Sequence, residues 1–258
     1  MARTAIVTGS TSGIGLGVAH RLAASGINIM LNGFGDAGEI EAIRTDIAAT
    51  HGVAVGYHGA DISDADQIHD LVATTASQIG PVDILVNNAG IQFTADITAF
   101  PRDRWDKIIA INLSGVFHGM QAALPGMIAR GWGRIINIAS VHGLVASKRK
   151  AAYVAAKHGV VGLTKVAALE TAKQGVTVNA ICPGWVLTPL VQKQIEDQAA
   201  EQNVDFETAK RGILADKQPS MDFVTPEQLG DLAVFLASDS GAQLTGQAIG
   251  MDGGWLAQ

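Results

Sequence analysis

The sequence is poor in cysteine and in positive charge. Its single cysteine, Cys182, excludes an intrachain disulfide and is typical of a protein in a reducing compartment. The formal net charge of −6, with no basic stripe along the chain, argues against nucleic acid as a partner. We therefore expect a cytoplasmic protein that binds neither nucleic acid nor a metal.

Membrane and linker signals are also missing. The N-terminal residues, MARTAIVTG, contain no apolar secretory core, and we find no stretch of about 18 uncharged apolar residues that would span a membrane. No internal repeat and no low-complexity linker divides the chain. With 258 residues, 48% of them apolar, the sequence predicts one α/β domain over residues 1–258 with ample material for a core.

Glycine is abundant, and it first matters in residues 9–15 (GSTSGIG). This turn follows a short apolar run at 4–8 and precedes an alanine-rich helical pattern at 16–24. A glycine turn between a strand and a helix lets the backbone approach a pyrophosphate, which the N–H groups of the helix start stabilise. The spacing is G-x-x-x-G-x-G rather than G-x-G-x-x-G, and a plain tight turn is the alternative.

Six more apolar runs predict strands, separated by helical patterns. The seven predicted strands cover residues 4–8, 27–32, 53–58, 82–86, 133–139, 176–181 and 245–251. Strands that alternate with helices predict a doubly wound, Rossmann-like parallel sheet of seven strands with helices on both faces. The polar stretch 190–222 breaks this alternation. We expect it to form a small helical substrate lid within about 186–222.

The end of the second predicted strand favours NAD over NADP. An acid at this point binds the 2′-hydroxyl of the adenosine ribose, whereas Arg or Lys accommodates a 2′-phosphate. The chain reads NGFGD over residues 32–36, and no Arg or Lys lies between Arg21 and Arg44. Asp36 lies several residues beyond the strand, so the prediction depends mainly on the missing cation.

Two other strand ends carry polar or small residues. Asp61 follows the third strand, where its carboxylate either accepts from the adenine amino group or caps the helix that starts near Ser63. Residues 87–90 (NNAG) follow the fourth strand, at the edge where open parallel sheets bind ligands. Gln92 comes next and is expected to point into the same crevice, with a solvated loop glutamine as the alternative.

The candidate chemistry concentrates in residues 140–157 (SVHGLVASKRKAAYVAAK). Lys150, Tyr153 and Lys157 stand at positions i, i+3 and i+7, which places them on one face of a helix. A nearby cation favours the ionised form of a phenol, and bringing its pKa from roughly 10 to neutrality takes about 4 kcal/mol. The pattern predicts a tyrosine that transfers protons, with an ordinary amphipathic pair as the alternative.

Asn112 lies in the middle of a long predicted helix at 104–130. A buried amide there is costly unless it is satisfied. It therefore binds a water in a proton path, bends the helix, or is a satisfied core amide, and the sequence alone leaves these alternatives open.

In combination, these motifs resemble the short-chain dehydrogenase/reductase family. The matching residues are TGSTSGIG at 8–15, NNAG at 87–90, Asn112, Ser140, Tyr153-x-x-x-Lys157 and Pro183-Gly184, in the family's order along essentially the whole chain. The resemblance implies that Tyr153 is the general acid/base, and that Lys157 lowers its pKa and holds the nicotinamide ribose. It also implies that Ser140 binds the substrate oxygen, that Asn112 anchors a water, and that the enzyme is a homotetramer.

The same resemblance implies a nicotinamide cofactor, NAD in this chain, and a set of residues that bind it. Besides Tyr153 and Lys157, these residues are Gly9, Thr11, Ser12, Ile14, Gly15, Phe34, Asp61, Ile62, Asn88, Ala89, Gly90, Pro183, Gly184, Val186 and Thr188.

Longer strings, among them LNGFGD, NNAGIQ and NAICPGWVLTPLVQKQI, resemble a branch of the family that acts on a small hydroxy acid. The resemblance implies that the chain interconverts (R)-3-hydroxybutyrate and acetoacetate. It places the substrate carboxylate among Gln92, His142, Lys150 and Gln194, where an ammonium group supplies charge and the other side chains supply directed donors.

Alternatives remain for this branch and for its residues. Lys150 is otherwise a surface lysine, and His142 a loop or capping histidine. Trp185 and Trp255 pack either on the short alkyl end of the substrate or in the core. At the level of function, the alternatives are a reductase of another ketone, such as a 3-oxoacyl thioester or a cyclic alcohol, and a dinucleotide-binding sensor without catalysis.

Overall fold

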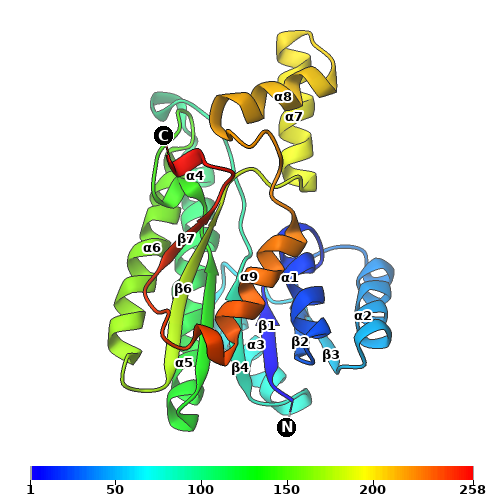
Figure 1. Ribbon diagram of the computed structural model, residues 1–258, viewed down its shortest axis with the longest axis vertical. Coiled ribbons are helices and arrows are strands. Elements are labelled where there is room, and N and C mark those ends of the chain that lie inside the picture. Colours follow the sequence, from blue (N-terminus) through cyan, green and yellow to red (C-terminus); the bar gives the residue numbers. More distant parts are fainter. Residues whose placement is uncertain (1, 258) are drawn as a thin grey trace.

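A parallel sheet of seven strands forms the centre of the molecule within residues 2–257, which the computed structural model describes (Figure 1). The strands lie in the order β3-β2-β1-β4-β5-β6-β7, and each pairing is parallel. The doubly wound sheet predicted from the sequence is thus confirmed. From β1 to β7, the strand bounds are Thr4–Val7, Asn28–Asn32, Val55–His58, Val82–Asn87, Gly133–Ile138, Val176–Pro183 and Ala248–Met251.

Helices cover both faces of this sheet. One face carries α1 (Gly13–Ala24), α2 (Ala37–His51) and α9 (Pro226–Ala237), and the other carries α3 (Ala65–Gln78), α5 (Gly115–Arg130) and α6 (Ala151–Thr171) (Figure 1). Successive strand residues point to opposite faces. Ile6 therefore belongs to the buried cluster under α3, α5 and α6, whereas Val7 belongs to the cluster under α1 and α9.

The long predicted helix contains a π-turn. It consists of α4 (Arg102–Ile109), a π-helical turn over Ala110–Ser114 and then α5. Asn112 lies in this turn and is fully buried. A π-turn widens the hydrogen-bond ladder locally and is frequent at functional sites.

This helix also corrects the expectation that no segment is apolar enough to span a membrane. Over Arg102–Arg130 it passes by length and composition, with a mean hydropathy of 1.2. However, it packs against α3, α6, β4 and β5. Packing against the sheet explains its apolar composition without a membrane.

A helical hairpin extends beyond the carboxyl ends of the strands (Figure 1). It consists of α7 (Pro189–Gln202) and α8 (Phe206–Lys217). Ile195 of α7 packs against Ala209 and Ile213 of α8 in a small buried cluster of their own. Most of the polar stretch 190–222 is therefore helical, and its buried apolar residues pack the two helices against each other.

Candidate active site

A cavity of about 400 Å³ lies where the carboxyl ends of the central strands meet the α7–α8 hairpin. The strand order reverses between β1 and β4, and open parallel sheets bind ligands at such a point. Gly15 and Asn112 are the two predicted site residues that do not line this cavity. Those that do are Gly9, Thr11, Ser12, Ile14, Phe34, Asp61, Ile62, Asn88, Ala89, Gly90, Gln92, Ser140, His142, Lys150, Tyr153, Lys157, Pro183, Gly184, Trp185, Val186, Thr188, Gln194 and Trp255.

The glycine turn brings the backbone of β1 close to the start of α1. Gly9 and Gly13 have φ values of +62° and +56°, which side chains rarely tolerate. A Cβ on Gly15 would overlap the Gly9 carbonyl oxygen and would lie 2.5 Å from Nδ2 of Asn88. Gly15 therefore lies beneath the cavity and acts by allowing this close packing.

The start of α1 offers uncapped backbone donors. Ser12 is the N-cap residue, yet its side chain makes no hydrogen bond to the first turn. Uncapped N–H groups and the positive end of the helix dipole favour an anion. The site therefore fits the pyrophosphate of a dinucleotide. Of the other α-helices, five have side-chain caps, at Asp36, Asp64, Thr188, Asp205 and Thr225, and α4, α5 and α6 have none.

The end of β2 carries a buried asparagine that supports the turn. The Oδ1 atom of Asn32 accepts from the Gly9 backbone N–H at 3.3 Å. Its Nδ2 atom donates to the carbonyl oxygens of His58 at 3.0 Å and Ala60 at 2.9 Å. The side chain of Asn32 is thus engaged with the protein, and the next side chain along the cavity wall is Phe34, which is 68% exposed.

Within the described residues, the acid and the two arginines that flank Phe34 in the sequence are engaged with other protein groups. Asp36 accepts from the backbone N–H groups of Gly38 and Glu39 and so caps α2. Arg21 pairs with Asp231 at 2.5 Å, and Arg44 pairs with Glu41 at 2.6 Å. The two arginines that flank this region in the sequence are therefore occupied elsewhere.

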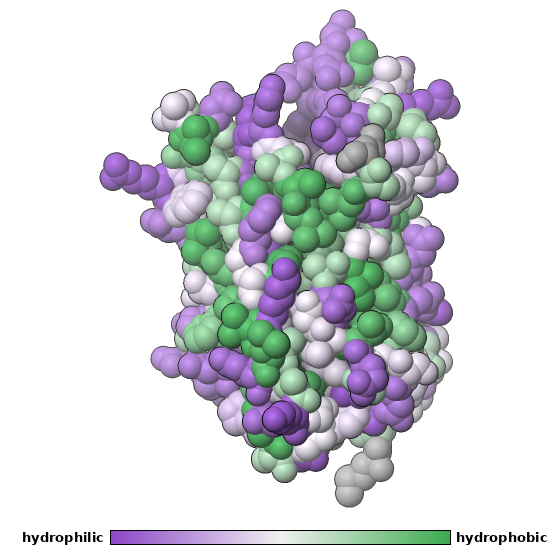
Figure 2. All heavy atoms as spheres, turned by 60° about the vertical axis from the view of Figure 1, so that its left-hand side comes forward, coloured by the Kyte–Doolittle hydropathy of each residue, from purple (hydrophilic) through white to green (hydrophobic). Residues whose placement is uncertain are grey.

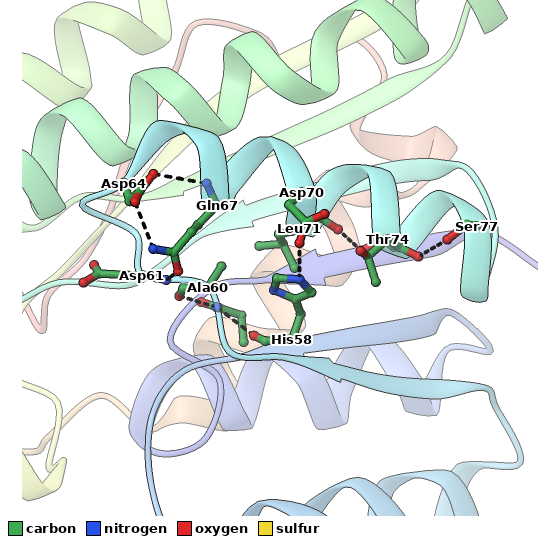
Figure 3. A network of polar contacts seen from close by, with 11 residues as sticks. His58, Ala60, Asp61, Asp64, Gln67, Asp70, Leu71, Thr74 and Ser77 are labelled. Atoms are coloured by element: carbon green, nitrogen blue, oxygen red, sulfur yellow. Dashed lines mark hydrogen bonds and ion pairs between the residues drawn. The ribbon is translucent and has the colours of Figure 1, made fainter.

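Figure 3 shows how the end of β3 leads into α3. Asp64 caps this helix by accepting from the backbone N–H groups of Asp66 and Gln67, so the alternative that Asp61 is the cap is wrong. Asp61 instead accepts from the backbone N–H and the hydroxyl of Ser63, at 2.8 and 2.7 Å. Asp61 lines the cavity, and its contact to adenine stays a prediction.

Ser140, Tyr153 and Lys157 meet in the cavity at the end of β5. Tyr153 and Lys157 lie on the same face of α6, as predicted, whereas Lys150 is the N-cap residue of this helix. The Nζ atom of Lys157 donates to the Ile138 carbonyl at 2.7 Å and lies 5.7 Å from the centroid of the Tyr153 ring. The three side chains thus form one cluster on two elements of secondary structure.

The charge states of this cluster differ from the expectation. Burial raises the pKa of Tyr153, and a hydrogen bond with Ser140 acts in the opposite direction. Burial also lowers the pKa of Lys157 to about 8. The Lys157 ammonium was expected to lower the pKa of the phenol, but it donates to the Ile138 carbonyl oxygen, and burial sets the direction in which the pKa of Tyr153 moves. Tyr153 is therefore protonated at neutral pH and is set to donate a proton.

Asn112 holds the loop beside the cavity. Its Oδ1 accepts from the Ile91 backbone N–H, and its Nδ2 donates to the Ile91 carbonyl oxygen, both at 2.9 Å. This pairing is the satisfied-amide alternative, and it fixes the backbone between Gly90 and Gln92. The role of Asn112 in anchoring a water stays a prediction.

Polar side chains gather opposite the glycine turn, beside Tyr153. Lys150 is half-buried, and desolvation lowers its pKa to about 8. Burial, together with the charge of Lys150, lowers the pKa of His142 to about 3, so His142 is neutral at neutral pH. The Nε2 atom of Gln92 is buried without a hydrogen-bond partner and lies in the cavity wall. Gln194 of α7 lines the same side.

Two tryptophans close this side of the cavity. The rings of Trp185 and Trp255 lie 5.9 Å apart, and Trp255 meets His142 edge-on at 5.4 Å. The Nζ atom of Lys150 lies 5.0 Å from the centroid of the Trp185 ring. The indole Nε1 of Trp185 is buried without a hydrogen-bond partner. Besides Lys157, the cavity wall therefore holds a pair of tryptophans, a second cation at Lys150, and the partnerless donors of Gln92 and Trp185.

The sequence did not single out several residues that support the side chains and backbone of the cavity. The hydroxyl of Thr8 accepts from the backbone N–H groups of Asn88 and Ala89, at 2.9 and 3.0 Å, and joins β1 to β4. Ser147 contacts Nε2 of His142 through its hydroxyl at 2.8 Å. Asn32 was seen only as a strand end. A small polar residue at a strand end was the available signal for Thr8 and Asn32, but none marked Ser147.

Comparison with known proteins agrees with this geometry. The family model described as short chain dehydrogenase matches residues 3–199. The chain is 61% identical over 257 residues to a D-beta-hydroxybutyrate dehydrogenase of Cupriavidus necator, covering 99% of this chain and 98% of the relative. It is 54% identical over 258 residues to a protein of the same name from Rhizobium meliloti, covering 100% of both.

A solved structure shares the fold over almost the whole chain. It is a variant of the actinorhodin polyketide ketoreductase with NADPH, with a TM-score of 0.93 and 36% sequence identity. The alignment covers 98% of this chain and 97% of the ketoreductase.

Proposed function

The chain belongs to the short-chain dehydrogenase family of oxidoreductases, and from this premise we propose that it interconverts (R)-3-hydroxybutyrate and acetoacetate with NAD. The observation that carries the proposal is the placement of Lys150 in the cavity beside Tyr153. A small hydroxy acid has one negative charge, and it needs a cation a few atoms away from the carbon that reacts. Relatives that are 61% and 54% identical carry the corresponding name.

The residues around the glycine turn, among them Gly9, Ser12 and Asn88, would hold NAD, which would supply the acceptor for a hydride from C3 of the substrate. During reduction, protonated Tyr153 donates its proton to the oxygen that becomes the hydroxyl, and during oxidation its phenolate form takes this proton back. Ser140 donates a hydrogen bond to the same oxygen. Lys150 binds the carboxylate, and neutral His142 and Gln92 add N–H donors. Trp185 and Trp255 enclose the alkyl end and exclude water.

NAD rather than NADP is proposed from the adenosine end of the cavity. Phe34 stands where a cation would be needed to neutralise a 2′-phosphate, and Arg21 and Arg44 are paired with carboxylates elsewhere. The expected result is turnover with NAD far above that with NADP at equal concentration. Comparable turnover with both cofactors would contradict this choice.

The position of the α7–α8 hairpin and the exposed apolar residues support two further proposals, a substrate lid and a homotetramer. We propose that α7 and α8 act as the substrate lid, because Gln194 of α7 lines the cavity.

Figure 2 shows apolar areas on the side of the molecule that carries α6. On α6 and α5, the exposed apolar residues are Val166, Leu169, Phe117 and Ile128. These exposed apolar residues support a homotetramer, which light scattering would test. The single cysteine supports a cytoplasmic location.

The experiment that tests the function is an initial-rate screen at 340 nm. It uses both enantiomers of 3-hydroxybutyrate, a cyclic alcohol and a 3-oxoacyl thioester, each with the NAD and the NADP couple. We expect the R enantiomer with NAD to give the highest kcat/KM. Preference for the thioester or the cyclic alcohol would favour another ketone reductase, and silence across the panel would favour a dinucleotide sensor.

A further inference from the structure

We propose that Gln218, which does not line the cavity, is a positioning residue that holds the tryptophan wall of the substrate site. The inference rests on the proposed function for its kinetic test. Gln218 ends α8 as its C-cap residue and is fully buried. A buried amide must find hydrogen-bond partners, and the partners of Gln218 are where the chain enters and leaves the hairpin.

The side-chain amide of Gln218 joins these two segments. Its Oε1 accepts from the backbone N–H of Trp185 at 2.8 Å, just before α7. Its Nε2 donates to the carbonyl oxygen of Asp222, after α8. The next connection is backbone only, from the Val224 N–H to the Trp185 carbonyl at 2.9 Å. Gln218 is therefore the side-chain link that fixes the backbone of Trp185.

A third segment packs on the same amide. A Cβ on Gly184 would lie 2.5 Å from Oε1 of Gln218, and a Cβ on Gly253 would lie 2.6 Å from its Cγ. The backbone N–H of Ser220 also donates to the Gly253 carbonyl at 2.9 Å. Residues 253–254 lead directly to Trp255. The amide thus touches the backbone on the approach to both tryptophans.

We expect this arrangement to make Gln218 affect the binding of substrate but not the binding of cofactor. Trp185 and Trp255 contact Lys150 and His142, so a displaced backbone at Trp185 moves the wall next to the carboxylate site. The glycine turn and the start of α1 make no contact with Gln218 among the hydrogen bonds and glycine contacts of the described chain.

The side chain at position 218 must accept from the Trp185 N–H and donate to the Asp222 carbonyl oxygen, and glutamine can do both. Methionine has a similar volume but leaves the Trp185 N–H and the Asp222 carbonyl without partners. Ionised glutamate keeps the acceptor, but it places a charged oxygen against the Asp222 carbonyl. Both Gln218→Met and Gln218→Glu are therefore expected to release the wall, the first by losing both bonds and the second by repulsion.

The test measures both KM values for the two variants, with Gln192→Met as the control. Gln192 lies exposed on α7 and pairs with Glu196. We expect the KM for (R)-3-hydroxybutyrate to rise about tenfold in both Gln218 variants, with the KM for NAD changed less than twofold. The control should match the wild type. NADH fluorescence titration first establishes that each variant is folded.

Three outcomes overturn the proposal. One is an unchanged substrate KM in a folded variant. The second is a parallel rise of both KM values, and the third is loss of NADH binding in both variants, since each would indicate a general structural role. Failure of the wild type to oxidise 3-hydroxybutyrate would contradict the proposed function instead. Faster amide hydrogen exchange at residues 184–186 in the variants would then still test the link itself, and unchanged exchange would refute it.

Discussion

The two halves of the cavity are built from different parts of the chain. The cofactor half is mostly backbone: left-handed glycines at Gly9 and Gly13, and an uncapped helix start at Ser12. The substrate half is mostly side chain: a lysine, a histidine, glutamines and tryptophans from β-strand ends, α6, α7 and the C-terminal loop. Backbone donors recognise what all dinucleotides share, whereas long side chains select one substrate. Under the proposed function, the first half would bind the dinucleotide and the second would select the substrate.

The largest expected effect falls on the chemistry between the two halves. Tyr153→Phe should lower kcat for 3-hydroxybutyrate about 1000-fold, which corresponds to about 4 kcal/mol, because the proton donor and acceptor is removed. NADH affinity, measured by fluorescence, should change little. A variant that keeps most of its turnover would show that Tyr153 does not transfer the proton.

The next effect separates the halves by charge. Lys150→Met should raise the KM for 3-hydroxybutyrate about 100-fold, since a charge-assisted bond to the carboxylate is worth roughly 1.5–3 kcal/mol. The KM for NAD should stay within about twofold. Lys148→Met is the matched control, because Lys148 is exposed on the same loop. Equal effects of both substitutions would place the carboxylate elsewhere.

A substitution in the cofactor half should give the opposite pattern. Gly15→Ala forces a Cβ against the Gly9 carbonyl oxygen and to within 2.5 Å of Nδ2 of Asn88, and it should raise the KM for NAD about tenfold. The substrate KM at saturating NAD should change less. Gly162→Ala on α6 is the control, since a Cβ there meets nothing within 4 Å. An unaffected NAD KM in Gly15→Ala would contradict the packing argument.

The pH dependence of the KM for 3-hydroxybutyrate is a further test of the role of Lys150, with a smaller expected effect. Desolvation lowers the pKa of Lys150 to about 8, so its binding-competent ammonium form is present below this pH and is lost as the pH rises. The KM for 3-hydroxybutyrate should increase about tenfold from pH 7 to pH 9. Lys150→Arg, which stays charged, should flatten this rise. An equal rise in the arginine variant would assign the titration to another group.

Prediction from the sequence succeeded where a motif controls the backbone. The apolar runs, the glycine turn and the NNAG segment placed the sheet and the cofactor half, because strand period and glycine conformations are local properties. The position of Tyr153 and Lys157 on one helical face was also local. The prediction that α6 includes Lys150 on its face was one residue off, because the helix begins at Ala151.

The remainder depended on contacts between distant segments. The pKa of Tyr153 moves in the opposite direction to the prediction because burial, which the sequence does not display, disfavours the phenolate. Gln218 gave no signal in the sequence, since its hydrogen-bond partners are the backbones of Trp185 and Asp222 and it packs against the C-terminal loop at Gly253.

The most direct measurement compares (R)-3-hydroxybutyrate with its methyl ester, which is neutral and otherwise nearly identical. If the substrate half is built around the carboxylate, kcat/KM for the acid should exceed that for the ester by about 100-fold, and Lys150→Met should remove most of this difference. An ester that reacts as well as the acid in the wild-type enzyme would contradict the assignment of this half of the cavity.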